Sequence, residues 1–246
     1  MKENLNSQPE NPSGTPLTLL KFVARSGLAS RRGSFELIKN GNISVNGNII
    51  TEPSFPLAGD EVVTANKKRL QVTERHYFML NKPVGYICTN DDPNAQLKAV
   101  DLIDVRGVRL FSVGRLDKDS EGLLLFTDDG DFAARLTHPR YGIIKTYKVW
   151  TDKPLSIKMI DTLCEGVTDQ GEKLSALSIT PESELVYIFK MKEGKKREIR
   201  RLIGSLNRKT ARLQRIAVGG LFLGDLPAGK WKPLSSREIK LALRNQ

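Results

Sequence analysis

The spacing of apolar residues changes from helical to alternating within the first part of the chain. Apolar residues three and four apart predict one helix that begins after Thr18 and ends at Gly27, and a second that begins after Ser30 and ends at Asn40–Gly41. The stretch ISVNGNII then alternates apolar and polar residues around an Asn-Gly pair, which predicts a β-hairpin. Residues 61–63 predict one further strand.

Strand-like patterns dominate the second part of the chain. After a polar joint at residues 66–74, apolar residues predict a strand over residues 77–80 and, as one continuous run, a buried strand over residues 123–126. The sequence NKPVG, just after the first of these strands, is typical of a Pro-Gly turn. The remaining pattern predicts a helix at residues 155–165 and strands near residues 176–180, 185–191, 213–218 and 231–234.

The acidic residues around the buried strand divide by the structural roles open to them. The three that follow it suit a turn and a helix start, with Asp131 as the expected N-cap. Asp117 precedes the strand, between Arg115 and Lys118, and has no such role. Nearby positive charge favours its ionised form. Asp117 is therefore the first candidate for chemistry.

Residues 146–150 alternate, which predicts a strand with Tyr147 and Val149 on one face and Lys148 on the other. A tyrosine in a strand is most often half-buried packing. In RNA-binding proteins an aromatic ring is also the usual platform for an unstacked base. Both roles stay open for Tyr147 at this point.

Charge adds a partner class to this picture. The 246 residues carry a formal net charge of +11, from 39 Lys and Arg against 28 Asp and Glu, and a phosphate backbone is the commonest partner of such a chain. The densest segment, FKMKEGKKREIRRLIGSLNRKTARLQR, predicts a helix that opens with Arg197, Arg200 and Arg201 and buries its apolar stripe. A basic helix can also lie on a membrane surface, but this one lacks Trp or Phe on its apolar face.

Composition also narrows the chemistry. Two cysteines and two histidines lack the spacing of a zinc site or of a disulfide framework, and a reducing cytoplasm fits them. No apolar run reaches the length of a membrane span. No metal cluster, nucleotide loop or Ser/His/Asp set is visible in the sequence, so a catalyst here must work with a carboxylate. A glycosidase pair of Asp117 and Asp119, or a calcium loop over residues 117–131, is disfavoured by the spacing.

The segment LLKFVARSGLASRRGSFELIKNGNISVNGNIITEPSFPLAGDEVV resembles the S4-like RNA-binding domain in its order of helix, basic-tipped helix and hairpin. The resemblance implies that Arg25, Arg31 and Arg32 lie against structured RNA. The alternative is a solvated helix face.

Three further segments, MLNKPVGYI, GRLDKDSEGLLLFTDDGDFAARLTHPRYGIIKTYKV and EGKKREIRRL, closely resemble the ribosomal pseudouridine synthases of the small-subunit-synthase branch. The resemblance covers roughly residues 16–240. It implies that Asp117 is the nucleophile and that Tyr147 stacks on the target base. It also implies that Arg200 pairs with the Asp117 carboxylate and keeps it ionised, and that Arg115 holds the flipped nucleotide. Because Glu198 stands where the family often has Gln, the role of Arg197 is less defined.

These observations predict an α+β protein with a disordered tail at residues 1–15, an S4-like domain at residues 16–74 and a synthase domain at residues 75–246 built on a mixed, mostly antiparallel sheet with flanking helices. The expected partner is ribosomal RNA or a pre-ribosomal particle, bound by a cytoplasmic monomer with no cofactor and no membrane contact. Lys195, Lys196, Arg197 and Arg201 are expected to contact RNA. The LLLFTDDGDFAARLTHP run favours large-subunit 23S rRNA as the substrate. Small-subunit 16S rRNA, or a non-catalytic role in ribosome assembly, are the alternatives.

Overall fold

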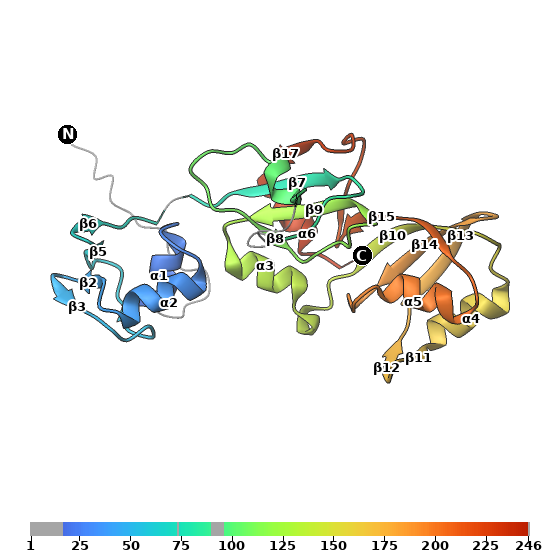
Figure 1. Cartoon of the computed structure of the whole chain (residues 1–246), viewed down its shortest axis with the longest axis horizontal. Helices are drawn as coiled ribbons and strands as arrows, with labels where there is room; N and C mark the ends of the chain where they lie inside the picture. Colours follow the sequence, from blue (N-terminus) through green and yellow to red (C-terminus); the bar gives the residue numbers. More distant parts are fainter. Residues whose placement is uncertain (1–16, 73, 90–95, 246) are drawn as a thin grey trace. The chain divides into compact units, whose positions relative to one another are not determined.

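The computed structural model describes residues 17–72, 74–89 and 96–245, so the predicted tail at residues 1–15 lies outside them. The chain forms two compact units, Met1–Arg75 and His76–Gln246, divided one residue after the predicted boundary. The colours of Figure 1 run from blue to cyan through the N-terminal unit and from teal to red through the C-terminal unit. Each unit has its own hydrophobic core.

The N-terminal unit packs two short helices on a small sheet. Its elements are β1 (Leu17–Thr18), α1 (Leu19–Arg25), α2 (Arg31–Lys39), β2 (Ile43–Val45), β3 (Asn48–Ile49), β4 (Pro56–Leu57), β5 (Val63–Ala65) and β6 (Lys68–Arg69). Both predicted caps are confirmed, since the side chain of Thr18 accepts from the Lys21 amide and that of Ser30 from the Gly33 amide. Four of the strands form a sheet in the order β3-β2-β5-β6, and β1 pairs with β4 in a separate two-stranded sheet.

Turn chemistry explains where the N-terminal prediction was right and where it was wrong. Asn46 and Gly47 both have positive φ and close the β2–β3 hairpin, as predicted. A second hairpin, β5–β6, turns at Asn66 and Lys67, which also have positive φ. The prediction that residues 66–74 form only a polar joint is therefore wrong. Asparagine tolerates the left-handed region, so the signal was present but weaker than Asn-Gly.

The C-terminal unit is built on one nine-stranded sheet in the order β13-β14-β10-β15-β9-β7-β17, with β16 beside β15 and β8 beside β9. Strands β11 and β12 form a separate two-stranded hairpin. The strands of the whole unit are β7 (Tyr77–Lys82), β8 (Phe111–Val113), β9 (Glu121–Thr127), β10 (Lys145–Thr151), β11 (Val167–Asp169), β12 (Glu172–Leu174), β13 (Ser178–Ser183), β14 (Val186–Met191), β15 (Thr210–Val218), β16 (Leu221–Phe222) and β17 (Trp231–Pro233). Its helices are α3 (Gly130–Thr137), α4 (Ile157–Glu165), α5 (Glu198–Ser205) and α6 (Ser236–Ala242), with short 3-10 turns at Ala99–Leu102 and Pro139–Tyr141. Only the β9–β15 pairing in this sheet is parallel within the described residues, which confirms the mixed, mostly antiparallel sheet.

The sheet has two halves that meet where β9 pairs with β15. In one half, α4 and α5 pack on β10, β13, β14 and β15 around buried Val149, Phe189 and Leu213 (Figure 1). In the other half, α3 and α6 pack on one face around Leu123 and Leu125, and residues between 99 and 116 cover the opposite face. The join is close, because Gly122 lies against the Arg215 backbone with φ of +104°. A Cβ at Gly122 would lie 2.3 Å from the Arg215 carbonyl oxygen.

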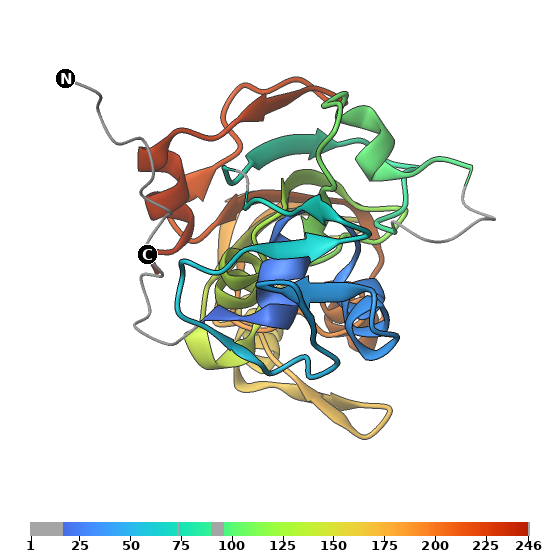
Figure 2. The same cartoon turned by 90° about the vertical axis from the view of Figure 1, so that its left-hand side faces the viewer.

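Three features of this unit differ from the prediction. The side chain of Asp129, not Asp131, caps α3, accepting from the amides of Asp131 and Phe132. The β11–β12 hairpin was not predicted, and Figure 2 shows it projecting from its unit. Helix α6 was also missed, although Ser235 and Glu238 form a capping box that the sequence SSRE displays.

Candidate active site

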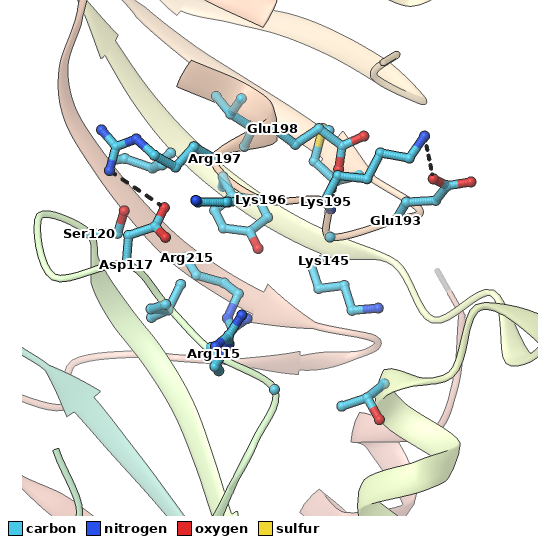
Figure 3. A pocket seen from close by; sticks show the side chains of 18 of the residues that line it. Arg115, Asp117, Ser120, Lys145, Glu193, Lys195, Lys196, Arg197, Glu198 and Arg215 are labelled. Atoms are coloured by element: carbon cyan, nitrogen blue, oxygen red, sulfur yellow. Dashed lines mark hydrogen bonds and ion pairs between the residues drawn. The ribbon is translucent and has the colours of Figure 1, made fainter. Parts of the chain in front are cut away.

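A cavity of about 530 Å³ opens in the C-terminal unit, on the face of β10 and β15 that also carries α5. It is lined by residues from the β8–β9 loop, from β10, from the loop before α5 and from β15. Figure 3 shows that positively charged side chains dominate this pocket and that Asp117 projects into it. The pocket brings together segments that lie about eighty residues apart in sequence.

Asp117 lies in the β8–β9 loop at the edge of the pocket. The loop turns back at Ser120, whose amide donates to the Asp117 carbonyl at 3.1 Å. The Asp117 side chain is 37% exposed, so a ligand in the pocket can reach its carboxylate. Its nearest cation is Arg197, with Nη1 4.0 Å from Oδ2 (Figure 3).

Lys82 holds the β8–β9 loop from the interior of the unit. Its side chain is fully buried, and Nζ donates to the carbonyls of Pro83, Asp117 and Ser120 at 3.0, 3.2 and 2.6 Å. Burial lowers the pKa of Lys82. This role was not predicted, because a Pro-Gly turn explains the NKPVG motif without the lysine. A signal was present: Lys82 ends a buried strand, where a charge needs partners.

The expected pairing of Arg200 with Asp117 is wrong. Arg200 instead contacts Asp119: Nε lies 3.3 Å from its carboxylate, and Nη2 donates to its carbonyl at 2.9 Å. Arg197 also binds Asp119, with two hydrogen bonds of 3.0 and 2.9 Å. The hydrogen bonds from Arg197, together with the charge of Arg200, hold the pKa of Asp119 below its usual range. Asp119 is therefore the anchor of the loop and not a plain loop residue.

The backbone of Arg197 explains why it reaches the loop. Arg197 is the residue before α5 and has φ of +51°, in the left-handed region that a non-glycine residue rarely adopts. This turn directs its guanidinium toward the β8–β9 loop, while the next residue, Glu198, is buried and accepts from the Lys195 amide. Burial raises the pKa of Glu198. Sequence spacing alone could not reveal a left-handed arginine.

Tyr147 lies where its alternation predicted. It lines the pocket from β10, half-buried, while Val149 on the same face is fully buried in the core under α4 and α5. Tyr147 thus meets that core at one edge and the cavity at the other. Arg115, on the β8–β9 loop, is exposed and also lines the pocket.

The remaining predicted RNA contacts fall into three groups. Lys195 and Lys196 line the pocket from the loop before α5. Arg201 does not line it: its guanidinium pairs with Asp169 and Glu172 of the β11–β12 hairpin, so it serves to hold that hairpin. In the N-terminal unit, Arg31 and Arg32 are exposed at the start of α2, and Arg25 ends α1.

Two basic residues of the pocket were not predicted. Lys145 lies at the start of β10, and Arg215 lies on β15 directly opposite Tyr147. Burial, and then the charge of Arg215, lower the pKa of Lys145. The KTYKV alternation places Lys145 on the same face as Tyr147, so a signal for it was available.

Within residues 17–72, 74–89 and 96–245, no three His, Cys, Asp or Glu side chains gather as a metal site would require. The helices in that same part of the chain are all too short or too polar to cross a membrane.

Comparisons with known proteins agree with this architecture. A family model described as RNA pseudouridylate synthase matches residues 76–205, and an S4 domain model matches residues 17–63. The chain is 32% identical over 229 residues to a ribosomal large subunit pseudouridine synthase B of Bacillus subtilis (strain 168), covering 90% of this chain and 93% of the relative. It is also 32% identical over 231 residues to a ribosomal small subunit pseudouridine synthase A of Escherichia coli (strain K12), covering 91% and 98%.

A solved structure entitled "Crystal structure of pseudouridylate synthase" superimposes with a TM-score of 0.67 at 29% identity, covering 92% of this chain and 99% of that one. The matched family region contains the whole β8–β9 loop with Asp117, as well as Lys82, Tyr147 and Arg197. The chain therefore belongs to the RNA pseudouridylate synthase family and carries an S4 domain.

Proposed function

We propose that this protein isomerises a uridine of ribosomal RNA to pseudouridine, with Asp117 as the nucleophile. The observation that carries the proposal is the placement of Asp117: its reachable carboxylate shares one cation-lined pocket with Tyr147, an aromatic ring on which a base can stack. The named relatives act on ribosomal RNA of either subunit.

The residues at the pocket suit the steps of such a reaction. A uridine within an RNA stem must leave the stack before a side chain can reach its glycosidic bond, which costs roughly a few kcal/mol. Arg115 and Tyr147 would hold the extruded nucleotide. The Asp117 carboxylate then attacks either C1′ of the sugar or the base, and the bond from C1′ to N1 breaks. The base turns, its C5 forms the new bond to C1′, and the bond between Asp117 and the nucleotide breaks, which returns the free carboxylate. C5 loses its proton, a step that Tyr147 would assist, and N1 gains one, so the product is an isomer.

The basic residues of both units would supply the binding energy. Lys195, Lys196 and Arg197 at the pocket, and Arg25, Arg31 and Arg32 in the S4 domain, would contact phosphates. A cytoplasmic monomer acting on rRNA or a pre-ribosomal particle, without a cofactor, completes the proposal. The LLLFTDDGDFAARLTHP run favours large-subunit rRNA, and a small-subunit target is the alternative.

One substitution tests the chemistry. Asp117→Asn keeps the shape of the side chain and removes the nucleophile, so rRNA binding stays near wild type while pseudouridine formation is lost. The measurement is pseudouridine mapping of rRNA from cells that carry the wild-type gene, the variant or no gene, and it also identifies the subunit. Asp104→Asn, an exposed acid on another loop, is the control. Pseudouridine at the wild-type level in Asp117→Asn cells would contradict the mechanism. RNA binding with no modification by the wild-type protein would favour an assembly factor.

A further inference from the structure

Four cations that line the pocket make no ion pair with any described carboxylate: Arg115, Lys145, Lys196 and Arg215. The other two cations differ, since Arg197 pairs with Asp119 and Lys195 pairs with Glu193. Lys196 is exposed on the loop before α5, whereas Lys145 and Arg215 lie on strands of the sheet. The pocket thus has an unneutralised side around Lys145 and Arg215.

The unneutralised side is built into the sheet. The Arg215 residue is only 5% exposed, and its Nε donates to the Leu123 carbonyl at 2.7 Å, which fixes the plane of the guanidinium. No other hydrogen bond of that guanidinium is found among the described residues, so its terminal N–H groups remain available to the pocket. Lys145 is half-buried, and its Nζ makes no hydrogen bond within the same set of residues. Figure 3 shows both side chains, with Arg115, on the side of the pocket below Asp117.

Two like charges in a partly buried place destabilise each other, and the lowered pKa of Lys145 reflects that burial and the charge of Arg215. A bound anion would offset the repulsion between the positive charges of Lys145 and Arg215. We propose that Lys145, Arg215 and Arg115 form a binding subsite for one phosphodiester group of the RNA strand next to the target nucleotide. This inference rests on the proposed function, because it assigns the RNA strand a path through the same pocket.

A phosphodiester fits these residues better than the base does. It carries a permanent negative charge and two free oxygens, which suit a fixed guanidinium and a lysine. A uracil ring is neutral before reaction, and Tyr147 already offers it a surface. The subsite would fix the strand on one side of the extruded nucleotide while Asp117 meets its sugar or base.

The test asks whether the effect of substituting Lys145 on RNA affinity depends on the charge of one particular phosphate. The probe is the shortest fragment of host rRNA that the wild-type protein binds, prepared in versions in which one phosphodiester at a time is a neutral methylphosphonate. We expect Lys145→Met to weaken binding of the unmodified fragment about tenfold, as loss of a charge-assisted hydrogen bond does. At one position the methylphosphonate should weaken wild-type binding by the same factor and leave Lys145→Met binding unchanged.

The matched control is Lys148→Met. Lys148 lies on the same strand but on the opposite face, paired with Glu182, and its substitution should be additive with every methylphosphonate. Lys145→Arg, which keeps the charge, should restore wild-type affinity. If Lys145→Met does not fold, Lys145→Gln gives the same reading. The proposal is overturned if Lys145→Met binds like wild type, or if its effect is additive with the methylphosphonate at every position.

Binding and turnover are read separately. An RNA that binds through Lys145 but never yields pseudouridine would contradict the proposed function and leave the subsite in place. Pseudouridine formation with no coupling between Lys145 and any phosphate would contradict the subsite and leave the proposed function in place.

Discussion

Individual side chains decide how Asp117 is presented, and most of them act through the backbone of its loop. Lys82 binds two carbonyls of the loop from below, and Arg197 binds Asp119 from the side. Asp117 itself could be singled out from sequence because its neighbours already had local roles. The side chains that hold its loop could not be assigned from the sequence, since Arg197 and Arg200 are only three residues apart. The left-handed backbone at Arg197 decides which oxygen of Asp119 each arginine contacts.

Lys82→Met tests the support from below. The substitution keeps most of the side-chain volume and leaves three carbonyls without their donor, of which the Ser120 carbonyl takes part in a buried hydrogen bond. A buried group that loses its partner costs about 1–3 kcal/mol. We expect the free energy of unfolding to fall by about 2–4 kcal/mol and isomerase activity to be lost. Denaturant unfolding and pseudouridine formation measure the two effects. Lys118→Met, exposed and next to Asp117, should change neither.

Asp119→Asn tests the support from the side and has a pH signature. The Asp119 carboxyl has a pKa below its usual range when folded, so it stabilises the fold above the unfolded value of about 3.9 and stops doing so as pH falls through the folded pKa. Because the side chain is 45% exposed, we expect a loss of only about 0.5–1 kcal/mol at pH 7.

The difference between Asp119→Asn and wild type should therefore narrow below about pH 3.9. We also expect kcat to fall on the order of tenfold, since a displaced loop misplaces Asp117, the proposed nucleophile. A stability difference that stays constant from pH 7 to pH 3 would contradict the assignment.

At the scale of elements, the sequence predicted what local chemistry encodes. The Asn-Gly hairpin, the serine and threonine caps and the buried β9 were all found. The β11–β12 hairpin was not, because its turn at Gln170 and Gly171 has positive φ without a strong sequence signal, and because Arg201 fixes it from a different element. Helix α6 was missed although its capping box, Ser235 with Glu238, can be read from the sequence.

Gly122→Ala tests the join between the two halves of the sheet. A methyl group there would meet the Arg215 carbonyl at 2.3 Å, on a residue with φ of +104°. We expect a loss of about 3 kcal/mol or more, as overpacking and backbone strain add. Gly130→Ala is the matched control, because nothing lies within 4 Å of a Cβ at that helical position. Thermal unfolding of both variants measures the effect, and equal melting temperatures would contradict the close approach at Gly122.

At the scale of the molecule, charge and modular order were predictable and the internal geometry of the pocket was not. The net charge of +11 indicated a polyanionic partner before any element was placed. The S4 domain and the synthase domain each have a sequence signature. The pocket, by contrast, joins the β8–β9 loop to residues about eighty positions later, and spacing along the chain carries no information about that approach.

The S4 arginines give a prediction at this scale. We expect the double substitution Arg31→Ala and Arg32→Ala to weaken rRNA binding, and to reduce the slope of log Kd against log salt by about 0.9 for each phosphate contact that is lost. Its melting temperature should stay at the wild-type value, since both side chains are exposed. Lys153→Ala with Lys158→Ala removes the same charge from an exposed part of the other unit and should leave the slope unchanged. An equal change in both double variants would indicate a general charge effect.

The parallel pairing of β9 with β15 consists of only two residue pairs, Glu121 with Gln214 and Gly122 with Arg215. It is also where the β8–β9 loop enters β9 and where Arg215 reaches the pocket. Brief separation of these two strands would therefore dismantle the pocket while the rest of each half stays folded. Amide hydrogens near this pairing should exchange with solvent before those inside either half. On heating, the enzyme should lose its activity before its circular dichroism signal changes.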